Sequence, residues 1–115
     1  MEIINPDSIE RDAAIQRFEF TFETIWKTAK DWLYVREGLD IGSPKSVIRA
    51  CREVGIFTDE EALLALEMVN DRNLTVHTYN EALAVEIYSR LTKYLPLMEK
   101  WLREIKLKSN NDYSL

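Results

Sequence analysis

The segment from Asn70 to Tyr79 contains the residues best suited to chemistry. It reads Asn-Asp-Arg-Asn-Leu-Thr-Val-His-Thr-Tyr, and it interrupts an apolar, helical pattern with polar side chains. Arg72 offers a planar set of hydrogen-bond donors that fits a phosphate. His77, the single histidine of the sequence, titrates near neutral pH and can act as a general acid or base. This combination suits the cleavage of a phosphodiester.

The spacing of these residues favours a shared site. Asn73 and His77 are four residues apart, so they lie on one face if a helix continues through them. Arg72 neighbours that face and has no acidic residue three or four positions away, which suggests a distant or external anion as its partner. The alternative interpretation is purely structural: a polar junction between helices in which side chains such as Thr78 cap free backbone groups.

RNA cleavage without a metal requires a base for the 2′-hydroxyl, an acid for the leaving oxygen and positive charge near phosphorus. One histidine cannot easily fill both proton roles, whereas a twofold-symmetric dimer would supply two. The sequence has no Gly-rich phosphate loop and no carboxylates spaced to complete a zinc site, so no metal or cofactor is expected. Cys51 lies on an apolar stripe, and we interpret it as a small buried hydrophobe rather than a nucleophile paired with His77.

Length and charge limit the class of protein. The 115 residues predict a single domain, 1–115, and the net charge of −5 argues against a broad phosphate-tracking surface. Between residues 53 and 86, Arg72 is the one basic residue among eight acidic ones. A lone cysteine, no visible signal peptide and no apolar run of membrane-spanning length predict a cytoplasmic protein without a membrane partner.

Helical spacing of apolar residues runs through the whole sequence, and no strand-like alternation appears. The first helix is expected from residue 7 or 8 to residue 35 or 36. Ser43 and Pro44 fit the N-cap and the first position of a second helix, and Gly55 fits its end. The third helix should begin with a capping box formed by Thr58 and Glu61.

A second capping box, Thr78 with Glu81, predicts the start of a fourth helix, which Pro96 should kink. The sequence therefore predicts an all-α, up-and-down four-helix bundle. Its long amphipathic helices, with three Trp and four Phe, favour a homodimer. The residues of the third helix expected to point inward are Ala62, Leu63, Leu66 and Val69.

Three segments carry a family resemblance. Residues 72–79, Arg-Asn-Leu-Thr-Val-His-Thr-Tyr, match the R-x4-H-x-Y form of the HEPN (higher eukaryote and prokaryote nucleotide-binding) superfamily motif. Residues 11–23 and 43–49 resemble its nucleotidyltransferase substrate-binding subfamily, which includes HepT-like toxins. The resemblance covers about residues 9–107 and implies an up-and-down bundle that forms homodimers or higher even oligomers. Family members usually carry an extra helix before this region, which a second subunit could replace here.

The resemblance also implies a partner, a minimal nucleotidyltransferase. In one view of such pairs the chain is a ribonuclease toxin of a type II toxin–antitoxin module, and the antitoxin neutralises it by adding AMP to a tyrosine. By position, Arg72 would stabilise phosphate, His77 would be the acid or base, Asn73 would support them, and Tyr79 would accept AMP. In the alternative view the chain is a non-catalytic docking or nucleotide-binding module for the nucleotidyltransferase.

Overall fold

The computed structural model describes residues 6–113. No strand occurs within this range, so the prediction of an all-α bundle of four helices is confirmed. The elements in chain order are α1 (Pro6–Glu37), α2 (Pro44–Glu53), α3 (Asp59–Leu74), the 3-10 helix η1 (Thr75–His77) and α4 (Glu81–Tyr113).

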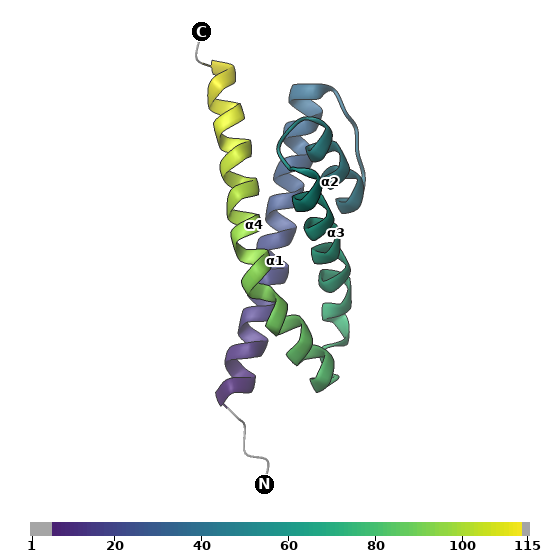
Figure 1. Ribbon diagram of the computed structural model, residues 1–115, viewed down its shortest axis with the longest axis vertical. Helices are drawn as coiled ribbons and strands as arrows, with labels where there is room; N and C mark the ends of the chain where they lie inside the picture. Colours follow the sequence, from purple (N-terminus) through teal and green to yellow (C-terminus); the bar gives the residue numbers. More distant parts are fainter. Residues whose placement is uncertain (1–5, 114–115) are drawn as a thin grey trace.

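The two long helices α1 and α4 lie side by side and run in the same direction, while α3 runs the opposite way (Figure 1). The short α2 packs against α1 and α3. The molecule is elongated, with principal extents of 64 × 23 × 22 Å. The α3–η1–α4 junction lies at the end of the molecule where α1 begins (Figure 1). This arrangement places the segment of chemical interest at one tip of the bundle.

Aromatic side chains from three parts of the chain hold the bundle together. The ring of Trp101 is fully buried and lies 5.1 Å from that of Phe57, centroid to centroid. The ring of Tyr94 stacks on Phe18 at 5.7 Å. Burial of such large apolar surfaces is the main favourable contribution to folding. The buried stripe of α1 follows helical steps of three and four and consists of Ile15, Phe18, Phe22, Ile25, Ala29 and Leu33.

The predicted starts of α2 and α3 are confirmed. The Ser43 hydroxyl accepts a hydrogen bond from the Ser46 N–H at the start of α2. At the start of α3, the Thr58 hydroxyl accepts from the Glu61 N–H, and the Glu61 carboxylate accepts from the Thr58 N–H. Gly55 has a φ of 86°, a left-handed conformation that L side chains rarely adopt, and it ends the region of α2 as expected.

The predicted capping box at the start of α4 is wrong. Asn80, not Thr78, caps this helix, because its side-chain oxygen accepts a hydrogen bond from the Leu83 N–H. The hydroxyl of Thr78 instead donates to the carbonyl of Thr75. The physical reason is that η1 continues the turn of α3 as far as His77, so Thr78 still belongs to the end of the preceding helix.

One inward-facing residue of α3 is also corrected. Leu63 is 68% exposed and points away from the core. Successive helical residues are about 100° apart, so Leu63 turns outward once Ala62 and Ala65 face the neighbouring helices. Val69 is buried as expected, whereas Leu66 is only partly buried.

The fourth helix continues through Pro96, and its ribbon changes direction partway along (Figure 1). Proline removes one helical hydrogen bond and crowds the preceding turn, which accounts for a bend without a break. Within the described part of the chain, no helix combines the length and apolarity needed to cross a membrane.

Candidate functional site

Side-chain hydrogen bonds shape the α3–η1–α4 junction. The Thr75 side chain is buried, and its hydroxyl donates to the carbonyl of Arg72 at 2.6 Å. The Thr78 hydroxyl donates to the carbonyl of Thr75 at 3.0 Å. The Asn80 N–H donates to the carbonyl of His77 at 3.0 Å. These bonds satisfy carbonyls that a helix end leaves free, so the chain can turn sharply and project His77 to the surface.

His77 and Tyr79 form an exposed pair at the tip of the molecule. The Tyr79 hydroxyl and His77 Nδ1 are 3.3 Å apart, and the two rings meet edge to face at 5.8 Å. When the hydroxyl donates to Nδ1, the neutral imidazole carries its proton at Nε2. Tyr79 is 85% exposed. The geometry therefore offers an imidazole able to exchange a proton with a ligand, next to an accessible phenol.

The distant anion expected for Arg72 lies within the chain itself. Arg72 Nη2 donates to Glu23 Oε2 on α1 at 2.7 Å, and Lys27 Nζ lies 3.3 Å from the other oxygen of the same carboxylate. Partial burial acts to raise the pKa of Glu23, but the nearby Trp26 indole, the Lys27 ammonium and the charge of Arg72 hold that pKa below its usual range. The Arg72 side chain is still 36% exposed, so part of its guanidinium remains open to an external anion.

The structure separates the predicted site residues into two groups. Arg72 and Asn73 border a cleft toward α1, together with Glu23, which the sequence did not single out as a site residue. His77 and Tyr79 do not line this cleft and contact each other. Among the described residues, no hydrogen bond, ion pair or ring contact joins the two groups. Within one chain the guanidinium is thus paired with α1, whereas the imidazole is paired with Tyr79.

Cys51 plays no part in either group. Its side chain is fully buried in the core, and burial raises the pKa of its thiol to about 11. The interpretation of Cys51 as a buried hydrophobe is confirmed. No group of three or more His, Cys, Asp or Glu side chains that could hold a metal ion occurs within the part of the chain that the structure describes.

A buried carboxylate that sequence reasoning missed lies directly before Arg72. Asp71 accepts two hydrogen bonds from Arg90, at 2.6 and 2.8 Å, and a further one from the Tyr94 hydroxyl. Burial and the bond to Asp71 raise the pKa of Tyr94, and the same carboxylate raises the pKa of Arg90. The signal in the sequence is the spacing of four between Arg90 and Tyr94, which places both on one face of α4.

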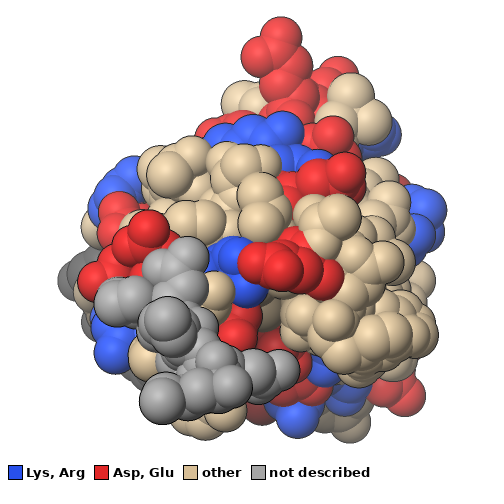
Figure 2. Space-filling view, turned by 90° about the horizontal axis from the view of Figure 1, so that it is seen from below, with Lys and Arg blue, Asp and Glu red and all other residues tan. Residues whose placement is uncertain are grey.

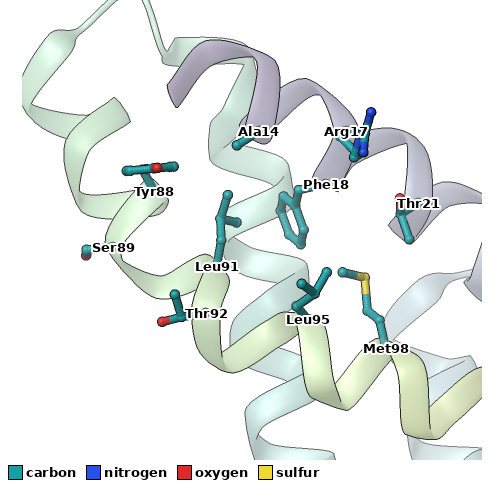
Figure 3. Close-up of a pocket in the computed structure, with 10 residues that line it drawn as sticks. All are labelled: Ala14, Arg17, Phe18, Thr21, Tyr88, Ser89, Leu91, Thr92, Leu95 and Met98. Carbon is teal, nitrogen blue, oxygen red and sulfur yellow. The ribbon is translucent and has the colours of Figure 1, made fainter. Parts of the chain in front are cut away.

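A second hollow lies between α1 and α4 and has a volume of about 390 Å³ (Figure 3). Its lining includes Phe18 and Arg17 on α1 and Leu91, Leu95 and Met98 on α4. Its lining includes no carboxylate, imidazole or thiol. This groove suits an apolar contact rather than acid–base chemistry.

Comparisons with known proteins identify the family. The family described as nucleotidyltransferase substrate binding protein like matches residues 3–107. The chain belongs to this family. A curated relative, the probable ribonuclease HepT of Haemophilus influenzae, is 30% identical over 105 residues, which cover 87% of this chain and 68% of the relative. A crystal structure of a Thermus thermophilus protein is similar at a TM-score of 0.82 and 57% identity, covering 91% of this chain and 87% of that one.

Membership of the nucleotidyltransferase substrate-binding family confirms the resemblance inferred from the three sequence segments. The match spans α1 through most of α4. The family therefore accounts for the bundle as a whole and not only for the segment around His77.

The buried Asp71 network yields a prediction about stability. Asp71→Asn would leave the partly buried guanidinium of Arg90 without its counter-charge, and it should lower the free energy of unfolding by about 2–4 kcal/mol. Urea unfolding followed by circular dichroism measures this. The matched control is Glu67→Gln, which removes an exposed ion pair with Lys93 and should change stability by less than about 1 kcal/mol. Equal effects of the two substitutions would contradict the importance of Asp71.

Proposed function

We propose that this nucleotidyltransferase substrate-binding protein is a metal-independent endoribonuclease and the toxin component of a type II toxin–antitoxin pair. The observation that carries the proposal is the exposed His77–Tyr79 pair, which follows Arg72 on the same α3–η1 segment. The name of the Haemophilus influenzae relative, probable ribonuclease HepT, supports RNA as the substrate class.

The proposed reaction uses only groups of the protein and the RNA. The 2′-oxygen attacks the adjacent phosphorus, and the bond from phosphorus to the 5′-oxygen breaks, giving a 2′,3′-cyclic phosphate and a 5′-hydroxyl. His77 takes the proton of the 2′-hydroxyl, and a protonated imidazole returns a proton to the leaving oxygen. Arg72 stabilises the negative charge that develops on the phosphoryl oxygens, through the part of its guanidinium that Glu23 does not occupy.

The two proton transfers call for a second copy of the chain, because each copy supplies one histidine. Within one chain Arg72 pairs with Glu23 and His77 with Tyr79, which is consistent with a site completed by two protomers. The apolar groove between α1 and α4 supports self-association, since Leu95 and Tyr88 line it and are 55% and 43% exposed. A homodimer, or a higher even oligomer, would cover these side chains.

Tyr79 is the proposed acceptor of AMP from the nucleotidyltransferase partner. Its phenol oxygen would attack the α-phosphorus of ATP, pyrophosphate would leave, and the phenol proton would be lost. The ring is accessible for this, and the hydroxyl lies beside His77. The added adenylate would bring bulk and negative charge next to the imidazole, which would repel an RNA phosphate.

A non-catalytic docking or nucleotide-binding module is the second candidate function. The ion pair between Arg72 and Glu23 favours it, because this arginine already has a carboxylate partner in the absence of any ligand. In this case the unmodified chain would not cleave RNA. It would instead bind the nucleotidyltransferase through the same tip.

Replacement of His77 tests the nuclease. Wild-type protein, shown by mass spectrometry to carry no AMP on Tyr79, should cleave RNA in the presence of EDTA, and His77→Ala should reduce the rate by about 10²-fold or more. Gln16→Ala, an exposed position on α1, is the control and should cleave like the wild type. The absence of cleavage by unmodified wild type on RNAs of varied sequence would favour the docking module.

Introduction of a charge into the apolar groove tests the dimer. Leu95→Glu should shift the protein toward monomer in analytical ultracentrifugation and should reduce RNA cleavage in parallel, since two copies are needed. Leu63→Glu is the matched control, because Leu63 is also exposed but lies on α3 outside the groove. If both variants kept the mass of the wild type, the groove would not be the interface.

Adenylylation should be specific for Tyr79. A nucleotidyltransferase encoded beside this chain, given ATP, should add AMP to the wild type and to Tyr34→Phe but not to Tyr79→Phe. Tyr34 is the control because it is 61% exposed and distant in sequence from the junction. Intact-mass spectrometry detects the adduct, and modification of Tyr79→Phe to the wild-type extent would reject this acceptor.

A further inference from the structure

The Tyr79 hydroxyl lies beside a base. Its oxygen is 3.3 Å from Nδ1 of His77, and this is the one hydrogen bond that joins the Tyr79 side chain to a described residue. The proposed function gives the imidazole a role in RNA cleavage and the phenol a role as acceptor of AMP. The contact brings these two groups together in a single hydrogen bond, so the chemistry of one affects the chemistry of the other.

A phenol needs a base before it becomes a good nucleophile. Phenols are almost entirely protonated at neutral pH, and an adjacent base activates such a hydroxyl by taking its proton as the new bond forms. When the Tyr79 hydroxyl donates to a neutral His77, the lone pair of Nδ1 can receive this proton. The 3.3 Å separation is close to the about 2.6–3.2 Å expected of a general base, and such contacts tighten when the reaction complex forms.

Other tyrosines of the chain lack this arrangement. Tyr94 donates its hydroxyl to a side chain as well, but the acceptor is the buried carboxylate of Asp71. Burial and the bond to Asp71 raise the pKa of Tyr94, so this phenol keeps its proton. Tyr34 and Tyr88 are exposed, and no hydrogen bond joins either hydroxyl to a described residue. Of these four tyrosines, Tyr79 alone combines an accessible ring with a neutral base at its hydroxyl.

The turn that carries the pair holds both residues in place. The Asn80 N–H donates to the carbonyl of His77 at 3.0 Å, and the hydroxyl and N–H of Thr78 both donate to the carbonyl of Thr75. These bonds fix the backbone from residue 75 to residue 80, so the two side chains start from defined positions two residues apart. A base held beside a nucleophile in this way saves the entropy of bringing the two groups together.

We propose that His77 is the general base that activates the phenol of Tyr79, so that the imidazole proposed to cleave RNA also promotes the modification that stops cleavage. The phenol oxygen attacks the α-phosphorus of ATP, the bond from that phosphorus to pyrophosphate breaks, and the phenol proton passes to Nδ1 of His77. The imidazolium then lies next to the negative phosphate of the new adenylate, which favours the product. This inference rests on the proposed function, because it takes Tyr79 as the acceptor of AMP.

The surface around the pair offers ATP little attraction of its own. Figure 2 looks onto the end of the molecule that bears the junction, and the visible part of that face shows acidic and basic groups interspersed rather than one broad basic area. The net charge of −5 also acts against the binding of a triphosphate. We therefore expect the nucleotidyltransferase to supply the nucleotide, whereas this chain supplies both the acceptor and its base.

The kinetics of AMP transfer test the base. His77→Asn can keep a hydrogen-bond acceptor near the position of Nδ1, but it cannot take up a proton at neutral pH. With the nucleotidyltransferase and ATP, it should lower kcat for transfer to Tyr79 by about tenfold or more and leave the KM for the chain unchanged. Free imidazole in the buffer should restore part of the rate to His77→Ala but not to Tyr79→Phe. Transfer to His77→Asn at the wild-type rate would overturn the inference.

A second measurement needs no nucleotidyltransferase. The reagent 4-(2-aminoethyl)benzenesulfonyl fluoride modifies an activated phenol: the phenol oxygen bonds to sulfur, fluoride leaves and the base takes the proton. Peptide mass spectrometry should show Tyr79 labelled about tenfold faster than Tyr34, which has no base at its hydroxyl. His77→Asn should remove this difference, and Val76→Ala, at an exposed position of the same turn, should retain it. Circular dichroism verifies the fold of each variant. Equal labelling of the two tyrosines in the wild type would contradict the activation of Tyr79.

The combined outcomes separate this inference from the proposed function. Modification of Tyr79 that depends on His77, in a chain that cleaves no RNA, would support the base and reject the nuclease. RNA cleavage that requires His77, together with normal AMP transfer to His77→Asn, would overturn the base and leave the nuclease intact. Sulfonyl labelling that depends on His77, without any transfer of AMP to Tyr79, would reject the acceptor and overturn the role of His77 in that transfer.

Discussion

The buried carboxylate of Asp71 is the interaction on which the functional end of the molecule depends. Its two bonds from Arg90 and the further bond from Tyr94 join the end of α3 to α4, and the ring of Tyr94 stacks in turn on Phe18 of α1. The carboxylate therefore links α3 directly to α4 and, through the ring of Tyr94, to α1. A displaced Asp71 would lose its hydrogen bonds from Arg90 and Tyr94, and a buried carboxylate without partners is costly. The backbone around residue 71 is therefore held in one position.

The orientation of the neighbouring residues follows from that constraint. Because the side chain of Asp71 points toward α4, that of Arg72 turns toward α1, where it reaches Glu23. The chain then passes through the 3-10 turn, stabilised by the hydroxyls of Thr75 and Thr78, and emerges with His77 at the surface. That the guanidinium and the imidazole have different partners within one chain thus follows from how the helix end is held.

The different partners of Arg72 and His77 determine what the proposed reaction would require. Under the proposed function, a site in which Arg72 is paired and His77 is exposed would be a half-site, and a second protomer would supply the second histidine. Under the proposed function, the acidic balance of the chain would limit nonspecific contact with RNA, so a few cations next to the junction would carry more of the interaction. The Glu23 carboxylate would then compete with an RNA phosphate for the guanidinium of Arg72.

Local sequence signals predicted the elements well. The capping residues Ser43 and Thr58 and the helical spacing of apolar side chains act within a few residues of one another, so both ends of α1 and α2 and the start of α3 could be predicted closely. The cap of α4 could not, because whether Thr78 or Asn80 fills that role depends on how far the turn of α3 persists. The outward orientation of Leu63 likewise depends on which neighbours α3 meets.

The sequence by itself determined the helical class, the family and the identity of the candidate residues Arg72, Asn73, His77 and Tyr79. Only the tertiary structure decided what each of them touches. The partner of Arg72 is 49 residues away in sequence, and those of Asp71 are 19 and 23 away. Such contacts form when helices pack, and no local propensity encodes them. For the same reason the cleft that Arg72 and Glu23 border is a property of the packed helices rather than of any one segment.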